Sequence, residues 1–191
     1  SYMRRMKMRL LFEMDKKDYD PNGSRFVRPS ARAIIVKGNR IVMVRSQKYD
    51  YYKFPGGGLE AGETPVSALI REVREEAGMV VIPESVREFG YVHRVQKGER
   101  QEIFVQDNFY YFCEVEEQVM EQKLDPYEEV EKFTMEFVLP EKAIAVNRSS
   151  EHGDRSDDPH LLAMAEREAR VLELLMREQY GKTKNTDINS R

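Results

Sequence analysis

The chain has 191 residues, of which 40% are apolar and 34% charged, so it is long enough to bury a core of its own. Its net charge of −3 argues against a general attraction to nucleic acid or to a membrane surface. No apolar run approaches the roughly 20 residues that cross a bilayer, and the single cysteine, Cys113, excludes an internal disulfide. The basic N-terminal residues are followed by no apolar segment, so we expect no secretory signal and a cytoplasmic protein.

The first third of the chain predicts strands joined by turns. Residues Met6–Asp15 alternate in part and predict an edge strand, whose basic residues are better explained as solvated edge charges than as a contact with RNA or phosphate. A turn-rich segment follows at residues 20–24. Two β-branched runs, Ala31–Val36 and Arg40–Arg45, flank a Gly-Asn pair and predict a hairpin.

A helix is predicted between Thr64 and Gly78. Thr64 suits the N-cap, Pro65 the first helical position, and Gly78 a left-handed C-cap. The apolar residues fall at helical spacing, so this helix turns one face to a sheet, and Glu72, Glu75 and Glu76 can face the other way. The predicted buried residues are Val66, Leu69, Ile70 and Val73.

The rest of the chain alternates strand and helix signals. Strands are predicted at Val86–Gln96, Gln101–Val105 and Asn108–Val115, with a turn at Lys97-Gly98. The remaining segments are an acidic loop at Leu124–Glu129, a short strand at Val130–Met135, a polar surface loop at Asn147–Pro159, an amphipathic helix at His160–Tyr180 and a polar tail from Gly181.

Three carboxylates stand close together at the end of the first helix. Glu72, Glu75 and Glu76 are spaced at i, i+3 and i+4, which places them on one helical face. Like charges this close repel unless something positive lies among them. Mg²⁺ is suited to this place because it prefers oxygen ligands and keeps several waters. The alternative is a solvated face neutralised by Arg71 and Arg74, and it loses weight because of the neighbouring glycines and the spacing to Glu63.

The segment from Gly57 to Met79 resembles the Nudix box, whose pattern is G-x5-E-x7-R-E-U-x-E-E-x-G-U, where U is a bulky apolar residue. Val73 and Met79 fill the apolar positions, and the subfamily stays open. The resemblance implies an α/β/α sandwich, in which a central mixed sheet is flanked by the box helix and the C-terminal helix. It also implies a single domain over residues 1–180, with 181–191 as a tail. The fixed positions that match are Gly57, Glu63, Arg71, Glu72, Glu75, Glu76 and Gly78.

The resemblance also implies roles for individual residues. Glu72, Glu75 and Glu76 would bind Mg²⁺ or Mn²⁺, and the carbonyl of Gly56 would add an oxygen ligand. Glu63 and Arg71 would form an orienting ion pair, and one of the glutamates would act as base toward the attacking water. Many Nudix enzymes take a further glutamate from a loop outside the box. We prefer Glu129 for that position, with Glu128 next and Glu116 and Glu117 as weaker alternatives, while a plain acidic surface loop stays an equal possibility.

The activity implied by the resemblance is Mg²⁺-dependent hydrolysis of a nucleoside diphosphate derivative, NDP-X, to NMP and P-X. The alternative is a Nudix-like nucleotide sensor or interaction module that has lost catalysis, and the intact box disfavours it. The expected partner is a small nucleotide-type substrate, and nucleic acid is not expected. The last helix either covers the sheet of its own domain or pairs with a second copy, so a homodimer is possible.

Overall fold

The computed structural model describes residues 7–189, with side chains as far as Glu178, and the chain forms two compact units. The first unit consists of the chain up to Val36 together with Phe54–Asp125, and the second of Lys37–Lys53 and the chain from Pro126 onward. Each unit pairs a sheet with helices, and the sheet of the first unit is mixed. The predicted α/β class is therefore confirmed, whereas the single domain over residues 1–180 stays a prediction.

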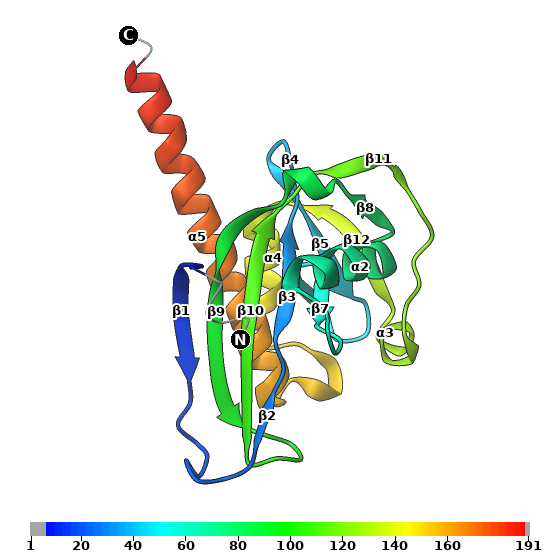
Figure 1. The fold of residues 1–191 in the computed structure, drawn as a ribbon, viewed down its shortest axis with the longest axis vertical. Helices are drawn as coiled ribbons and strands as arrows, with labels where there is room; N and C mark the ends of the chain where they lie inside the picture. The colour runs from blue at the N-terminus through cyan, green and yellow to red at the C-terminus, as the bar shows by residue number, and fades with distance from the viewer. Residues whose placement is uncertain (1–6, 190–191) are drawn as a thin grey trace. The chain divides into compact units, whose positions relative to one another are not determined.

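The first unit is built on a six-stranded sheet in the order β1-β9-β10-β3-β7, with β2 also paired to β10 (Figure 1). Neighbouring strands run antiparallel at β9–β10 and β3–β7, and parallel at β1–β9 and β10–β3. The predicted edge strand is β1, and its expected start at Met6 lies outside the described residues. The strands are β1 Leu10–Asp15, β2 Arg25–Val27, β3 Ser30–Ile34, β7 Gly56–Gly58, β9 Arg87–Lys97 and β10 Ile103–Phe112. A separate ladder joins β8 Met79–Val81 to β11 Val115–Val119, and a short 3₁₀ turn spans Pro83–Ser85.

Strand β10 replaces two shorter strands expected at Gln101–Val105 and Asn108–Val115. The predicted break falls on Gln106 and Asp107, whose polar side chains are nevertheless buried in the sheet. Asp107 Oδ1 lies 2.6 Å from Nδ1 of His93 on β9, and the Gln106 amide donates to Ser30 Oγ at 3.1 Å. Since cross-strand partners satisfy these groups, the strand continues through them.

The hairpin expected from Ala31–Val36 and Arg40–Arg45 is only partly correct. Strand β3 pairs with β7 and β10, so its partners lie far away in sequence. Only β4, Val36–Lys37, pairs with β5, Arg40–Ser46, across a turn at Gly38 with φ of 63°. The whole of β3 is buried, and burial on both faces favours pairing inside a large sheet over a local hairpin.

The predicted box helix is α2, Pro65–Ala77. Thr64 Oγ1 accepts from the Ser67 N–H at 3.1 Å, and Ser67 Oγ accepts from the Thr64 N–H at 3.0 Å, which closes a capping box. Gly78 ends the helix with φ of 68°, as expected. Leu69 and Val73 are fully buried, while Val66 and Ile70 are only half-buried.

Replacement of Thr64 by alanine is expected to lower the free energy of unfolding by about 1 kcal/mol, because the N-cap acceptor is lost. Urea denaturation monitored by circular dichroism measures this change. Thr64→Ser keeps the hydroxyl and serves as the control, so an equal loss in both variants would contradict the capping role.

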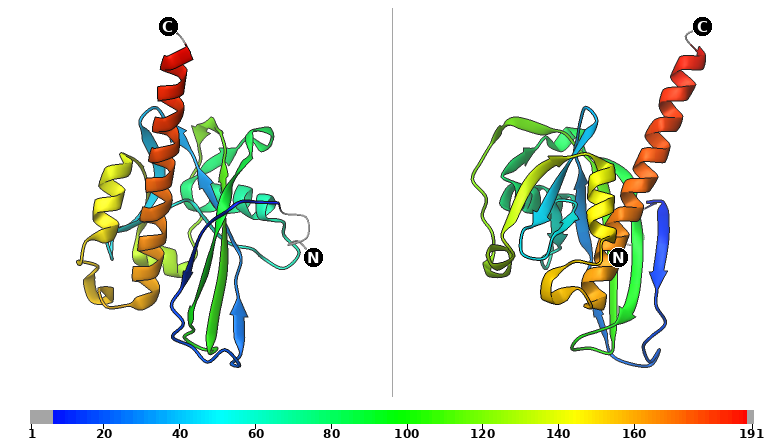
Figure 2. Two further views of the ribbon diagram at one scale, coloured as in Figure 1. Left: turned by 90° about the vertical axis from the view of Figure 1, so that its left-hand side faces the viewer. Right: turned by 180° about the vertical axis from the view of Figure 1, so that it is seen from behind.

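The second unit contains a four-stranded sheet in which β5 pairs antiparallel with β12 and with β6, while β4 lies beside β5. Helices α4 and α5 lie next to each other in Figure 2, and both contact β6. Within residues 7–189, none of the helices has both the length and the apolar composition of a membrane span. The remaining elements are β6 Tyr51–Lys53, α3 Pro126–Glu131, β12 Phe133–Val138, α4 Pro140–Arg148 and α5 Pro159–Asn189.

Several expectations for this unit were wrong in their boundaries. The acidic loop ends in α3, and β12 begins at Phe133 instead of Val130. Helix α4 was missed because few of its residues are large and apolar, and Ala143 is its one buried apolar residue. Helix α5 continues to Asn189, through most of the segment expected to be a polar tail, because a polar composition does not by itself end a helix.

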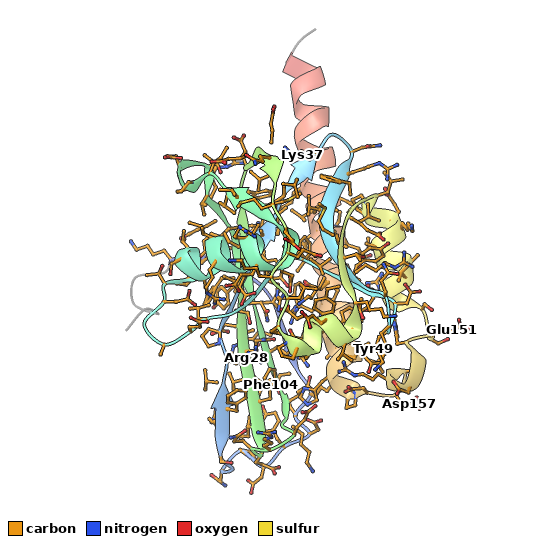
Figure 3. All side chains as sticks on the ribbon, turned by 90° about the vertical axis from the view of Figure 1, so that its right-hand side faces the viewer. Arg28, Lys37, Tyr49, Phe104, Glu151 and Asp157 are labelled. Atoms are coloured by element: carbon orange, nitrogen blue, oxygen red, sulfur yellow. The ribbon has the colours of Figure 1, made fainter. Side chains whose placement is uncertain are left out.

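The segment expected to be a surface loop at Asn147–Pro159 is partly buried. Asn147 closes a pair of hydrogen bonds with the Tyr52 backbone, at 2.7 Å to its N–H and 2.8 Å to its carbonyl oxygen. His152 is fully buried, and its Nδ1 lies 3.0 Å from the carbonyl oxygen of Tyr49. Only part of the segment faces solvent, including Glu151 and Asp157, which Figure 3 labels together with Tyr49. A 3₁₀ turn at Gly153–Arg155 follows the buried histidine.

Candidate active site

The short strand β7 brings a glycine-only backbone against β3 and α2. Gly56 has φ of 148°, and a Cβ atom there would lie 2.0 Å from the carbonyl oxygen of Ala31. At Gly57 a Cβ atom would lie 2.7 Å from Cδ of Glu72. Gly56 therefore requires glycine for its close pairing with β3, and at Gly57 the missing Cβ leaves room for the carboxylate of Glu72 from α2.

Arg71 gathers the acidic residues of the box around one guanidinium group. Its Nε and Nη2 donate to the two oxygens of Glu63 at 2.9 and 2.8 Å, a bidentate pair. Its Nη1 donates to Glu72 at 3.0 Å and to Glu75 at 3.3 Å, and Nη2 also reaches the Gly58 carbonyl oxygen at 3.2 Å. The structure therefore contains the ion pair expected between Glu63 and Arg71.

This pairing changes the pKa of both groups. The hydrogen bonds from Arg71 lower the pKa of the Glu63 carboxyl, and the bond to Glu63 raises the pKa of the Arg71 guanidinium. The pKa of Glu63 in the folded protein is below its ordinary value. The pair therefore stabilises the fold at pH values above the ordinary pKa of a glutamate. The stabilisation is lost as the pH falls through the lower, folded-state pKa.

Several carboxylates of this cluster share the guanidinium of Arg71. Arg71 lies within 4 Å of four carboxylates, those of Glu60, Glu63, Glu72 and Glu75. Arg74, the other base expected to neutralise them, points elsewhere and donates to the Glu121 carbonyl oxygen at 2.7 Å. One guanidinium is therefore shared by several carboxylates, and carboxylates gathered this closely favour a nearby cation.

Glu76 does not face away from the sheet as expected. It is 1% exposed, and its Oε1 accepts from the Gly56 N–H at 3.1 Å. Burial of a carboxylate costs free energy unless it is hydrogen-bonded, so this contact fixes the side chain against strand β7, here called the glycine strand. Glu72 and Glu76 therefore meet the successive residues Gly57 and Gly56.

The donor set fits a hard divalent cation. Every expected ligand is an oxygen, from Glu72, Glu75, Glu76 or the Gly56 carbonyl, which matches the preference of Mg²⁺. The glutamates also lie in the C-terminal half of α2, where the helix dipole is negative and attracts cations. Among the side chains that the structure describes, no group of three acidic, histidine or cysteine side chains is arranged closely enough to bind one metal ion. In this structure Arg71 lies between Glu72 and Glu75 and donates a hydrogen bond to each. Shared ligation by these residues stays a prediction.

The glutamates expected outside the box lie on several elements. Glu129 is exposed on α3, and its neighbour Glu128 is buried. Both belong to the second unit, while the box belongs to the first. Glu116 and Glu117 are exposed on β11 of the first unit. A catalytic role for any of them stays a prediction.

Comparison with known proteins identifies a family model and relatives that match this chain. A model of the NUDIX domain matches residues 27–159. The RNA pyrophosphohydrolase of Halorhodospira halophila is 43% identical over 53 residues, which cover 27% of this chain and 29% of that protein. The RNA pyrophosphohydrolase of Xanthomonas campestris pv. campestris is 30% identical over 117 residues, which cover 56% of this chain and 55% of that protein. The chain thus spans about half or less of the length of these relatives.

A solved structure shows the same fold. The NUDIX hydrolase from Nitrosomonas europaea superposes with a TM-score of 0.51 at 18% identity, covering 74% of this chain and 87% of that one. The likeness confirms the predicted Nudix fold. The NUDIX domain model covers well over half of the chain, and the matched residues contain the glycine strand, the Glu63–Arg71 pair and every fixed position of the box. The chain therefore belongs to the NUDIX family.

Proposed function

We propose that the protein is a Mg²⁺-dependent pyrophosphohydrolase that cleaves a phosphoanhydride bond in a nucleoside diphosphate derivative, NDP-X, to give NMP and P-X. The observation that carries this proposal is the convergence of Glu72 and Glu76 on the Gly56–Gly57 backbone, beside the carboxylates that share Arg71. The two relatives named RNA pyrophosphohydrolase support the reaction class and add RNA as a candidate carrier of the anhydride.

The geometry suits hydrolysis of a pyrophosphate. Such a reaction needs neutralisation of the phosphate charge and an activated water, and bound Mg²⁺ would supply both. Glu72, Glu75 and Glu76 would hold the ion, and one of them would accept the proton of the water. As the water oxygen bonds to phosphorus, the bond from that phosphorus to the bridging oxygen breaks, and the bridging oxygen leaves with the other product. The glycine backbone at 56–57 lets the backbone of β3 and the carboxylate of Glu72 approach it closely. The Glu63–Arg71 pair holds the segment before α2 to the helix that carries the carboxylates.

Further parts of the proposal concern the ion and the partners. Mn²⁺ would substitute for Mg²⁺, since both accept carboxylate and carbonyl oxygens. The cytoplasm and a nucleotide-type substrate are proposed from the sequence. A homodimer is a weaker proposal, and sedimentation of a single 22.5 kDa species would exclude it.

The competing proposal is a sensor or interaction module that binds a nucleotide without cleaving it. The complete box disfavours this alternative, because a protein that no longer catalyses has no need for the full set of carboxylates. Tight nucleotide binding with no turnover, in protein shown to contain bound metal, would favour it.

A hydrolysis screen tests the proposal. The panel contains oxidised nucleotides, nucleotide sugars, dinucleoside polyphosphates, RNA with a 5′-triphosphate and capped RNA, each incubated with Mg²⁺ or with EDTA. We expect cleavage in Mg²⁺ alone, products identified by mass spectrometry as a monophosphate and a phosphate-containing partner, and no cleavage by Glu75→Gln. Reaction in H₂¹⁸O then locates the attacked phosphorus. A metal-loaded wild-type protein that leaves the whole panel intact would contradict the proposal.

A further inference from the structure

The end of the box helix is capped by a segment more than forty residues downstream, Met120–Lys123, here called the anchor segment. The Lys123 N–H donates to the Glu75 carbonyl oxygen at 2.7 Å, and the Gln122 side-chain amide donates to the Glu76 carbonyl oxygen at 2.6 Å. The Met120 N–H donates to the Gly78 carbonyl oxygen at 2.6 Å. In the other direction, Arg74 Nη1 of the helix donates to the Glu121 carbonyl oxygen at 2.7 Å.

These contacts provide hydrogen-bond donors for backbone carbonyls at the end of α2. The last four carbonyl groups of an α-helix have no partner within the helix. Gly78 satisfies the carbonyl of Arg74, and the next two, those of Glu75 and Glu76, are the ones that the anchor segment reaches. The last turn of α2 also carries the carboxylates of Glu75 and Glu76 at the negative end of the helix dipole, where a negative charge is unfavourable. Hydrogen-bond donors at these carbonyls therefore stabilise a turn that would otherwise fray.

Gly78 contributes to this docking as well as to the helix cap. A Cβ atom at Gly78 would lie 2.0 Å from the Met120 carbonyl oxygen and 3.5 Å from Cγ1 of Val119. The fixed glycine of the box thus has two roles, a left-handed C-cap and a surface on which the anchor segment can lie against the helix.

We propose that the anchor segment positions the carboxylates of Glu75 and Glu76 for the metal, with Gln122 as its principal positioning residue. Glu76 is then held at two points, its carbonyl by Gln122 and its carboxylate by the Gly56 N–H. Glu75 is held at its carbonyl by the Lys123 N–H, while its side chain reaches Arg71. This inference rests on the proposed function, because it assigns Gln122 a task in the same site.

The test measures Mn²⁺ binding directly, by electron paramagnetic resonance on the full chain without substrate. Gln122→Met keeps the size of the side chain but removes the donor, and it is expected to raise the Mn²⁺ dissociation constant about tenfold, as loss of an outer partner of a metal ligand typically does. The matched control is Gln118→Met, the same replacement at an exposed glutamine on β11. It is expected to bind Mn²⁺ as the wild type does.

A second variant addresses the backbone contact. Lys123→Pro removes the N–H that reaches Glu75, and weaker Mn²⁺ binding is expected again. In both variants a high Mg²⁺ concentration should restore most of kcat, because the carboxylates are still present. A purely structural role would lower the melting temperature and leave the Mn²⁺ dissociation constant unchanged.

The outcomes separate the two proposals. Unchanged Mn²⁺ binding in Gln122→Met would overturn the positioning role and leave the proposed function standing. Absence of Mn²⁺ binding to the wild type would remove the proposed function and the positioning role together. Tenfold weaker binding in Gln122→Met, with Gln118→Met at the wild-type value, would support both.

Discussion

Replacement of Glu76 by glutamine is expected to lower the rate of hydrolysis by at least about 100-fold, because even the outer partners of metal ligands contribute 10- to 100-fold. The amide oxygen of glutamine can still accept from the Gly56 N–H, so the contact that fixes this buried side chain survives. What disappears is the negative charge expected at the metal. Steady-state kinetics in saturating Mg²⁺ on the substrate identified by the screen measures the effect.

Folding and activity must be separated in this experiment. Circular dichroism and the melting temperature of Glu76→Gln should stay close to those of the wild type. Glu84→Gln, at an exposed position on the 3₁₀ turn, is the matched charge control and should keep full activity. If Glu76→Gln retained more than half of the wild-type rate, Glu76 could not be a metal ligand.

Replacement of Gly56 by alanine is expected to cost about 3 kcal/mol or more of stability. The added Cβ would lie 2.0 Å from the Ala31 carbonyl oxygen and 2.9 Å from the Arg32 Cα, and both atoms belong to the backbone of the neighbouring strand. Since a backbone cannot rotate aside as a side chain can, β7 must separate from β3, and overpacking of this kind costs 1–3 kcal/mol or more. Urea denaturation with linear extrapolation measures the loss.

The control for strain without collision is Gly62→Ala. Gly62 has φ of 82°, and among the described residues beyond its own chain neighbours no atom lies within 4 Å of its would-be Cβ, so only the left-handed backbone is penalised, by about 1–2 kcal/mol. Gly56→Ala should therefore be clearly less stable than Gly62→Ala. Equal losses would show that β7 does not pair with β3 as closely as described.

The box helix could be predicted from the sequence because its signals are local. Thr64, Pro65 and Gly78 each act within a few residues of the helix ends, and Leu69 and Val73 mark the buried face. The pair of Glu63 and Arg71 was implied by the resemblance to the Nudix box, and the structure contains it.

The pairing of strands could not be predicted, since it depends on distant partners. The runs around Gly38 suggested a local hairpin, while β3 finds its partners in β7 and β10. The polar residues Gln106 and Asp107 suggested a break that cross-strand hydrogen bonds remove. In the second unit, His152 looked like a loop residue, although it is buried against backbone carbonyls.

Within the site, two features could not be predicted from the sequence, and the reason is the same for both. Helical spacing places Glu76 near Glu72, but it does not show that Glu76 is drawn in by the Gly56 N–H. The anchor segment carries no pattern that predicts its contact with the end of α2, because backbone groups of Met120, Glu121 and Lys123 make most of the hydrogen bonds. Every residue except proline has the same backbone N–H and C=O groups, so contacts made by the backbone of a distant segment cannot be predicted from residue types.

The most direct test of the account is the location of the metal. Crystals of the wild-type protein soaked in Mn²⁺ should show an anomalous difference peak bounded by Glu72, Glu75 and Glu76 beside the Gly56 carbonyl, and crystals of Glu76→Gln should show it weakened or absent. An anomalous peak elsewhere in the wild type, or none at saturating Mn²⁺, would contradict the claim that this helix turn and glycine strand form a metal site.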